Sequence, residues 1–349
     1  MTPEAAPLNA PRIPWWLWPN VLSLDAPIVA VLCQMALARA HKVALMPEIS
    51  WTLFLAVWLI YIVDRVLDGF SMPDPDRISA RHAFYQRHRW LYLLVIVPAG
   101  GITLLWLGLT AIPAIIFWRG IALGFLVALY LLHYAARGNR PIYIVGNVVA
   151  CLVGGMVLWV LPLATPFKML YGTVLAALLV LALGGGMKQG FRLMPKEMLC
   201  GYLFAIGCSL GVNFFTGDQQ AHPFSPEVLM LALLCSLNCI AISCYERVAN
   251  KHHDPDAITQ TWPNVARVYP MLLVTLAGLA CWTLYQQFEG FTLTQKLPVP
   301  LVLFSVAVLM CTALLGVVHH LAKKNPPELS HVLADAAIAV PILVMVMAG

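Results

Sequence analysis

Two aspartates four residues apart, Asp64 and Asp68, stand at the end of an apolar stretch of the chain. In a helix this spacing places both carboxylates on one face. Acids are unfavourable at a helix C-terminus, where the helix dipole prefers cations, and they are costly in a membrane without a partner. The pair therefore requires a cation, either a divalent metal ion or a nearby arginine such as Arg65 or Arg81.

A basic segment follows this pair of acids. Gly69 and Pro73 predict the end of the helix, and a hydrophilic loop is expected to come after it. The loop contains Arg81 and Arg87, each followed by a histidine. Such side chains can neutralise the charge of a phosphate group. An ordinary basic loop at a membrane surface explains the same pattern, and both interpretations stay open at this point.

A second acidic stretch occurs much later in the chain and reads LNCIAISCYERVANKHHDPDA. Its Glu246, Asn250 and Asp254 are spaced by four and would share one face if the helix continued that far. Asn238, two turns before Glu246, would lie on the same face, and Lys251 adds a cation. Oxygen donors without cysteine suit Mg²⁺, which usually bridges carboxylates to a substrate phosphate.

Several of these polar residues have simpler explanations. Glu246 can pair with a neighbouring cation at the interface, and Asn238 can make an interhelical hydrogen bond. Asp25, near the start of the first apolar segment, is a secondary candidate together with Asn20 and Gln34. Arg119 lies inside an apolar segment, so its charge needs a buried partner or a route to the surface.

The composition indicates where these residues act. The chain of 349 residues is 61% hydrophobic and only 11% charged, with a mean hydropathy of +0.81. Soluble domains are about 25% charged, so we expect a polytopic helical membrane protein that forms one integral membrane domain over residues 1–349. The net charge of +5 fits basic loops at an anionic leaflet and requires no nucleic-acid partner. The nine cysteines are expected to be free thiols, because all lie in apolar stretches.

Apolar segments of about 20 residues are long enough to span a bilayer, and the sequence contains eleven of them. They are approximately 21–40, 49–68, 90–109, 112–136, 142–164, 168–187, 198–217, 227–248, 265–285, 299–321 and 329–348. The glycine-rich ends of the fifth and sixth segments also suit close helix contacts or broken helices. Alternating the loops puts 16 of the 21 lysines and arginines on the N-terminal side. This bias predicts a multi-pass protein of the cell (inner) membrane with a cytoplasmic N-terminus.

Two acidic helix ends on one side of a membrane bundle give the chain a resemblance to a known family. The layout resembles the UbiA-type polyprenyltransferase superfamily, whose first motif is close to N-x-x-x-D-x-x-x-D. Asp64 and Asp68 match the two acids of that motif, while Ile60 stands where the family has asparagine. The second motif of the family is rich in aspartate at spacings of three and four, and Glu246, Asn250 and Asp254 match it loosely.

The resemblance implies a function and a set of roles. It implies an all-α transmembrane bundle of nine to eleven helices that moves an isoprenoid chain from a prenyl diphosphate to a lipophilic acceptor with Mg²⁺. The implied metal ligands are Asp64, Asp68, Glu246, Asn250 and Asp254, of which Asp64, Asp68 and Glu246 are the catalytic candidates. The implied substrate-binding residues are Arg81, Arg87, Lys251, Asn238 and Asn250. The alternative is a membrane protein without this catalysis, either an inactive relative or a transporter.

Overall fold

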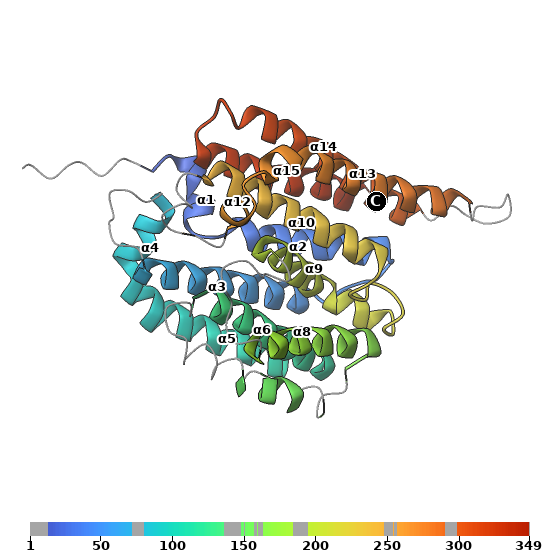
Figure 1. Ribbon diagram of the computed structural model, residues 1–349. Coiled ribbons are helices and arrows are strands. Elements are labelled where there is room, and N and C mark those ends of the chain that lie inside the picture. Colours follow the sequence, from blue (N-terminus) through green and yellow to red (C-terminus); the bar gives the residue numbers. More distant parts are fainter. Residues whose placement is uncertain are drawn as a thin grey trace, which may run out of the picture.

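The computed structural model describes residues 13–71, 80–135, 148–149, 151–156, 159, 163–183, 195–247, 254, 257–289 and 299–348. All regular structure in these ranges is helical (Figure 1), which confirms the prediction of an all-α chain. The helices are η1 (Trp15–Leu17), α1 (Trp18–Val21), α2 (Asp25–Ala40), α3 (Pro47–Ser71), α4 (Ala80–Leu91), η3 (Tyr92–Ile96), α5 (Val97–Thr110), α6 (Ala114–Ala135), α8 (Thr165–Leu183), α9 (Lys196–Phe215), α10 (Pro226–Tyr245), α12 (Ile258–Thr261), α13 (Val265–Glu289), α14 (Val299–Leu321) and α15 (Pro327–Ala348).

Eight helices in the described part of the chain are long and apolar enough to cross a membrane. They coincide with the predicted second, third and fourth segments and with the seventh to eleventh segments. A ninth crossing results if η1 and α1 are counted together with α2 as one bent span. The sixth segment corresponds to α8, whereas most of the fifth lies outside the described residues. The chain is therefore a multi-pass membrane protein by the length and composition of its helices.

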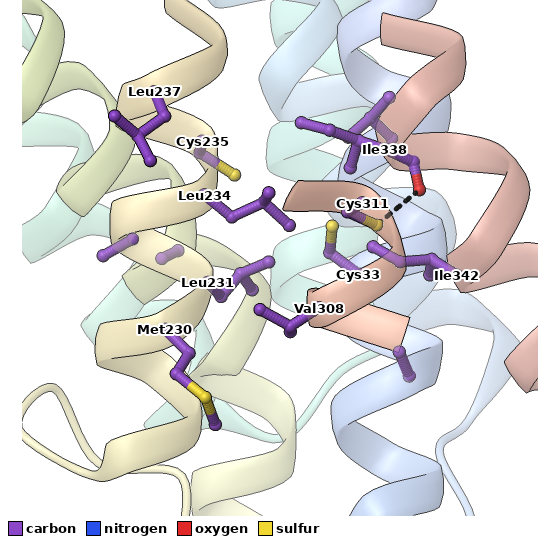
Figure 2. Packing of buried hydrophobic residues seen from close by; sticks show 14 of the residues in the cluster. Cys33, Met230, Leu231, Leu234, Cys235, Leu237, Val308, Cys311, Ile338 and Ile342 are labelled. Carbon is purple, nitrogen blue, oxygen red and sulfur yellow. Dashed lines mark hydrogen bonds between the residues drawn. The ribbon is translucent and has the colours of Figure 1, made fainter. Parts of the chain in front are cut away.

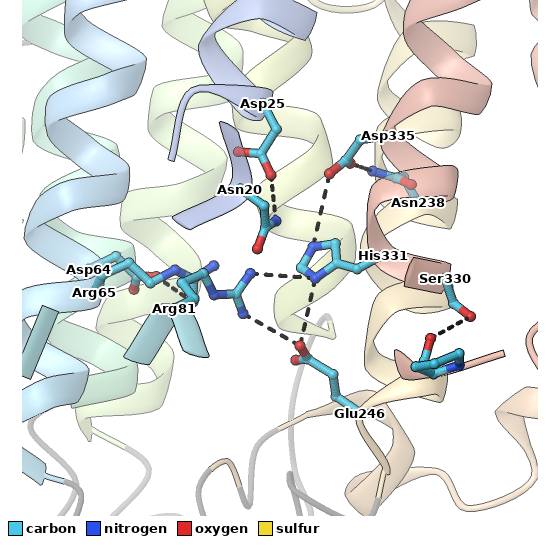
Figure 3. A network of polar contacts seen from close by, with 11 residues as sticks. Asn20, Asp25, Asp64, Arg65, Arg81, Asn238, Glu246, Ser330, His331 and Asp335 are labelled. Atoms are coloured by element: carbon cyan, nitrogen blue, oxygen red, sulfur yellow. Dashed lines mark hydrogen bonds and ion pairs between the residues drawn. The ribbon is translucent and has the colours of Figure 1, made fainter. Parts of the chain in front are cut away.

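The first predicted span is wrong in one respect, because it is not one continuous helix. η1 and α1 meet α2 at an angle of 76°. The break falls at Ser23, whose φ of +54° is outside the helical range. Pro27 favours the break, because a proline ring clashes with the carbonyl group four residues earlier, which here is that of Ser23. The bend lets α2 begin at Asp25, and it brings Asn20 back toward the start of α2 (Figure 3).

The segment after the first acidic pair was predicted as a loop, and this prediction is wrong for the residues that the structure describes; residues 72–79 lie outside them. α3 runs through Gly69 to Ser71, and α4 then leads through a π-helical turn, η3, into α5. The seven-residue spacing of Tyr85 and Tyr92 is two helical turns, so a helix puts both side chains on one face. Tyr85 is fully buried against Ile62 and Val66 of α3, and Tyr92 packs in the same small cluster. Arg81, Arg87 and Arg89 thus lie on a helix that contacts α3.

The main core lies among α2, α9, α10, α13, α14 and α15, and Figure 2 shows part of it. α9 and α10 approach most closely at Gly201, where a Cβ atom would stand only 2.4 Å from the backbone nitrogen of Ser236. Cys33, Cys235 and Cys311 point into this core as free thiols, as the sequence predicted. Because α2, α10 and α15 are neighbours in the core, the start of α2, the end of α10 and the start of α15 meet at one end of the bundle.

Candidate functional site

A group of polar side chains gathers at that end of the bundle, and we call it the polar cluster (Figure 3). It comprises Asn20, Asp25, Asp64, Arg65, Arg81, Asn238, Glu246, His331 and Asp335. These residues come from six different helices or helix ends, and Arg81 and His331, which contact each other, are 250 positions apart in the sequence. The cluster is enclosed by apolar helices, so each of its charges needs a partner within it.

The centre of the polar cluster is a three-way contact between Arg81, Glu246 and His331. Arg81 is only 6% exposed, and its Nη2 donates to Glu246 Oε1 at 3.4 Å. His331 is 7% exposed, and its Nδ1 lies 3.6 Å from the same carboxylate oxygen and 3.4 Å from Arg81 Nη1. One carboxylate at the end of α10 therefore holds a cation from α4 and an imidazole from α15.

These contacts determine the charge of Glu246. Burial by itself would raise the pKa of this carboxyl group, but Arg81 and the hydrogen bond to His331 outweigh burial and lower the pKa well below its usual range. Glu246 is consequently ionised at neutral pH. The arrangement differs from a free acidic ligand, because an arginine and a histidine already occupy the oxygen that faces the cluster.

A second part of the cluster consists of two carboxylates, Asp25 and Asp335. Asn20 donates its amide to Asp25 Oδ2 at 2.6 Å, and Asn238 donates its amide to Asp335 Oδ1 at 2.7 Å. His331 lies beside the two acids, with its Nε2 4.0 Å from Asp335 Oδ2 (Figure 3). One ligand atom from each of Asp25, His331 and Asp335 can be chosen so that all three lie within 4.8 Å of one another.

Asp64 occupies the edge of the cluster. Its carboxylate is 41% exposed and lies 3.8 Å from Arg65 Nη1. Asp64, Arg81 and Glu246 thus lie at the same end of the bundle, and Asn238 joins them through Asp335 and His331. Arg87 is exposed on α4. The side chain of Asp68, and residues Asn250 and Lys251 entirely, lie outside the described residues.

The shared helix face of Glu246, Asn250 and Asp254 required α10 to continue past Glu246, and it does not; Asn250 itself lies outside the described residues. α10 ends at Tyr245, and Glu246 is its C-cap with φ −91° and ψ 13°. Asp254 forms an ion pair with Lys196 at the start of α9. The proline after Asp254 opposes a helix through that residue, because the residue before a proline is disfavoured in the helical region.

The sequence analysis missed His331 and Asp335. A signal was present, because an ionisable residue eight positions into an apolar span is costly unless it faces a polar partner. His331 and Asp335 are also spaced by four, which puts them on one face of α15. Asp25 and Asn20 were secondary candidates and lie in the cluster, whereas Gln34 lies elsewhere and accepts a hydrogen bond from Ser50 at 2.7 Å.

The opposite end of the bundle carries a separate ion pair. Arg119 in α6 is 5% exposed and donates to both carboxylate oxygens of Asp218, at 2.6 and 2.7 Å, and to Asn213 Oδ1 at 3.1 Å. Asp218 lies in the connection between α9 and α10. This pair supplies the buried partner that the sequence required for Arg119 but did not identify.

Comparisons with protein-family models, with curated proteins and with solved structures found no match for this chain.

Proposed function

We propose that the chain is a membrane-embedded transferase of the UbiA-like type, which moves an isoprenoid chain from a prenyl diphosphate to a lipophilic acceptor. One observation carries the proposal. Asp64 at the end of α3, Arg81 on α4 and Glu246 at the end of α10 are far apart in sequence, yet they gather in one polar cluster at one end of an apolar bundle. In the proposed orientation this end faces the cytoplasm of a cell whose inner membrane holds the protein.

The residues at the site differ in how well they suit Mg²⁺. Asp64 suits it, because its half-exposed carboxylate offers an oxygen donor that water can also reach. Glu246 suits it less well, because its inward oxygen is engaged by Arg81 and His331. We therefore assign Mg²⁺ to Asp64 together with Asp68, and we give Glu246 the role of holding Arg81 in place. When bound, the ion supplies positive charge for the diphosphate.

The other groups have distinct proposed roles. Arg81 stabilises the negative charge that develops on the diphosphate as the C–O bond breaks, a role that often dominates catalysis. The apolar interior of the bundle holds the isoprenoid tail and keeps water away from the allylic cation. Arg87, exposed one and a half turns further along α4, attracts the substrate to this end of the protein.

A second candidate function is that of a membrane protein without catalysis. The observation in its favour is that Arg81 and Glu246 contact each other, so that much of their charge is already compensated within the protein. In this case the cluster stabilises the bundle, as in an inactive relative. A transporter is the other form of this alternative, because Asp25 and Asp335 are ionisable groups that approach or enter the membrane-spanning helices.

The deciding experiment measures diphosphate release by purified protein incubated with Mg²⁺ and labelled prenyl diphosphates. We expect release by the wild type, and we expect Asp64→Ala and Asp68→Ala each to abolish it while the protein stays folded. Glu246→Ala should reduce release by a comparable amount, because Arg81 loses its position, and Asn250→Ala should reduce it less.

Glu48→Gln is the matched control, because Glu48 is an acid in the first turn of α3, at the opposite end of the helix that carries Asp64. This variant should release diphosphate at the wild-type rate. If the wild type neither binds a prenyl diphosphate in a Mg²⁺-dependent way nor releases diphosphate, the transferase proposal is wrong and the non-catalytic alternative stands.

A further inference from the structure

Asp25, His331 and Asp335 form a compact set of ligand atoms that the proposed transferase does not use. The set joins the start of α2 to the first three turns of α15, and it lies deeper in the polar cluster than Asp64 (Figure 3). It contains two carboxylates and one imidazole. Among the described residues, neither Asp25 nor Asp335 forms a salt bridge with a lysine or an arginine.

The imidazole of His331 is aimed between the two carboxylates. This side chain is 9% exposed, and its Nδ1 accepts a hydrogen bond from Arg81 Nη1 at 3.4 Å and lies 3.6 Å from Glu246 Oε1. Its Nε2 makes no hydrogen bond to any described residue, and the nearest carboxylate oxygen stands 4.0 Å away. This distance is too long for a hydrogen bond between the imidazole and the carboxylate. It leaves room for a metal ion that both groups could bind.

Each of the three groups also has an outer partner of the kind found around metal ligands. A metal-bound histidine usually gives the N–H of its other ring nitrogen to a carboxylate. Glu246 Oε1, 3.6 Å from Nδ1 of His331, is the carboxylate that would take this position once Nε2 binds the metal and Nδ1 no longer accepts from Arg81. Asn238 and Asn20 hold one oxygen of Asp335 and one of Asp25. Asn238 has in addition a buried Oδ1 without a hydrogen-bond partner, which can accept a hydrogen bond from a metal-bound water.

From these observations we propose that Asp25, His331 and Asp335 bind a divalent first-row transition metal ion such as Mn²⁺, Fe²⁺ or Zn²⁺. Two carboxylates balance the charge of one such ion, so the site is neutral when the ion is bound. The imidazole favours these metals over Mg²⁺, which prefers oxygen ligands only. A metal about 2.1 Å from each ligand separates the ligands by at most about 4.2 Å, so closing the set requires shifts of roughly half an ångström.

This inference does not rest on the proposed transferase. The two sites have different metal ligands and share only Glu246, which positions Arg81 in one and stands beside His331 in the other, so each can fail without the other. If Mn²⁺ binds but no diphosphate is released, only the transferase proposal falls. If diphosphate is released but Mn²⁺ does not bind here, only the metal site falls.

Mn²⁺ is the probe, because its electron spin resonance reports both binding and ligand type. The full chain in detergent, stripped with a chelator, is titrated with Mn²⁺ in the presence of excess Mg²⁺. We expect one tightly bound Mn²⁺ per chain and a nitrogen hyperfine coupling from His331. Asp25→Asn and Asp335→Asn, which keep side-chain volume, should each weaken binding at least tenfold, and His331→Gln should remove the nitrogen coupling.

Two further variants make the test specific. Asn238→Ala removes an outer partner and should weaken binding about 10–100-fold, whereas Asp64→Asn and Glu48→Gln should leave it unchanged. The proposal is overturned if the wild type binds no stoichiometric Mn²⁺, if the bound Mn²⁺ shows no nitrogen coupling, or if Asp64→Asn weakens binding as much as Asp335→Asn does. The nitrogen coupling is measured on the wild type, so it decides the question even where a variant fails to fold.

Discussion

Glu246→Gln tests whether the pair of Arg81 and Glu246 stabilises the polar cluster. The glutamine keeps the size of the side chain and one acceptor oxygen, but it removes the charge. Two unit charges at the observed 3.4 Å attract each other by about 5 kcal/mol at an effective dielectric constant of about 20. The desolvation of both groups offsets much of this attraction, so the attraction alone overstates the loss.

The burial of the two partners sets the expected magnitude. Removing one partner of a fully buried ion pair costs about 3–5 kcal/mol, because the other charge stays buried without compensation. Arg81 is 6% exposed, but Glu246 is 24% exposed, so water can approach the guanidinium group when the carboxylate is removed. We therefore expect Glu246→Gln to lower the free energy of unfolding by about 2–3 kcal/mol, less than the fully buried case.

Thermal unfolding in detergent at a fixed scan rate is the assay, because heating a membrane protein is commonly irreversible and only matched scans can be compared. Arg81→Gln and the double variant complete a mutant cycle, and groups in contact should show a coupling of about 1–3 kcal/mol. Glu48→Gln serves as the control and should change stability by less than about 0.5 kcal/mol. A Glu246→Gln protein that melts with the wild type, or a cycle without coupling, would refute the reasoning.

The same variant has a pH dependence of known sign. The folded state lowers the pKa of Glu246 below the value of 4.5 that applies without the surrounding protein. The stabilisation is therefore fully present above pH 4.5 and is lost as the pH falls toward the folded pKa. The difference in melting temperature between the wild type and Glu246→Gln should accordingly stay constant near neutral pH, at roughly pH 6 to 7. It should shrink as the buffer becomes more acidic.

Two other predictions concern the rest of the bundle. Asp218→Ala should lower the free energy of unfolding by about 2–4 kcal/mol, because it leaves the buried Arg119 with Asn213 as its hydrogen-bond partner. Asp218→Asn should lower it by less. Thermal unfolding measures both, and equal losses for the two variants would contradict this account. The segments 69–89 and 249–264 should both face the cytoplasm, because the bias of basic residues requires it; cysteine labelling of either segment from outside intact spheroplasts would disprove the orientation.

The membrane-spanning helices could be predicted because their signal is local. A bilayer requires about 20 consecutive apolar residues, and that requirement is visible in any stretch of sequence without knowledge of its neighbours. The bend before α2 was missed although its cause is also local. Pro27 favours a break at Ser23, but the surrounding residues are apolar enough to hide the break in a hydropathy argument.

The polar cluster could be predicted only in part, because its meaning depends on contacts between distant segments. Asp64 and Glu246 attracted attention because acids at helical spacing form a recognisable motif. His331 and Asp335 have no comparable motif, and an isolated acid in a span indicates only that some polar partner exists. The partner of Asp335 is Asn238, almost a hundred residues away, and nothing in the sequence around either residue identifies the other.

The contacts within the cluster separate its carboxylates into two kinds, and this division bears on both proposals. Asp64 and Glu246 each contact an arginine, whereas Asp25 and Asp335 contact amides and an imidazole. Amides orient a carboxylate but do not neutralise it, so the second pair has the greater need for a cation. The motif at Asp64 and Asp68 suggests where a substrate-bridging Mg²⁺ would bind in the presence of a diphosphate. The electrostatics of Asp25 and Asp335 instead favour a metal that binds without substrate, and for this reason the Mn²⁺ titration is performed on the protein alone.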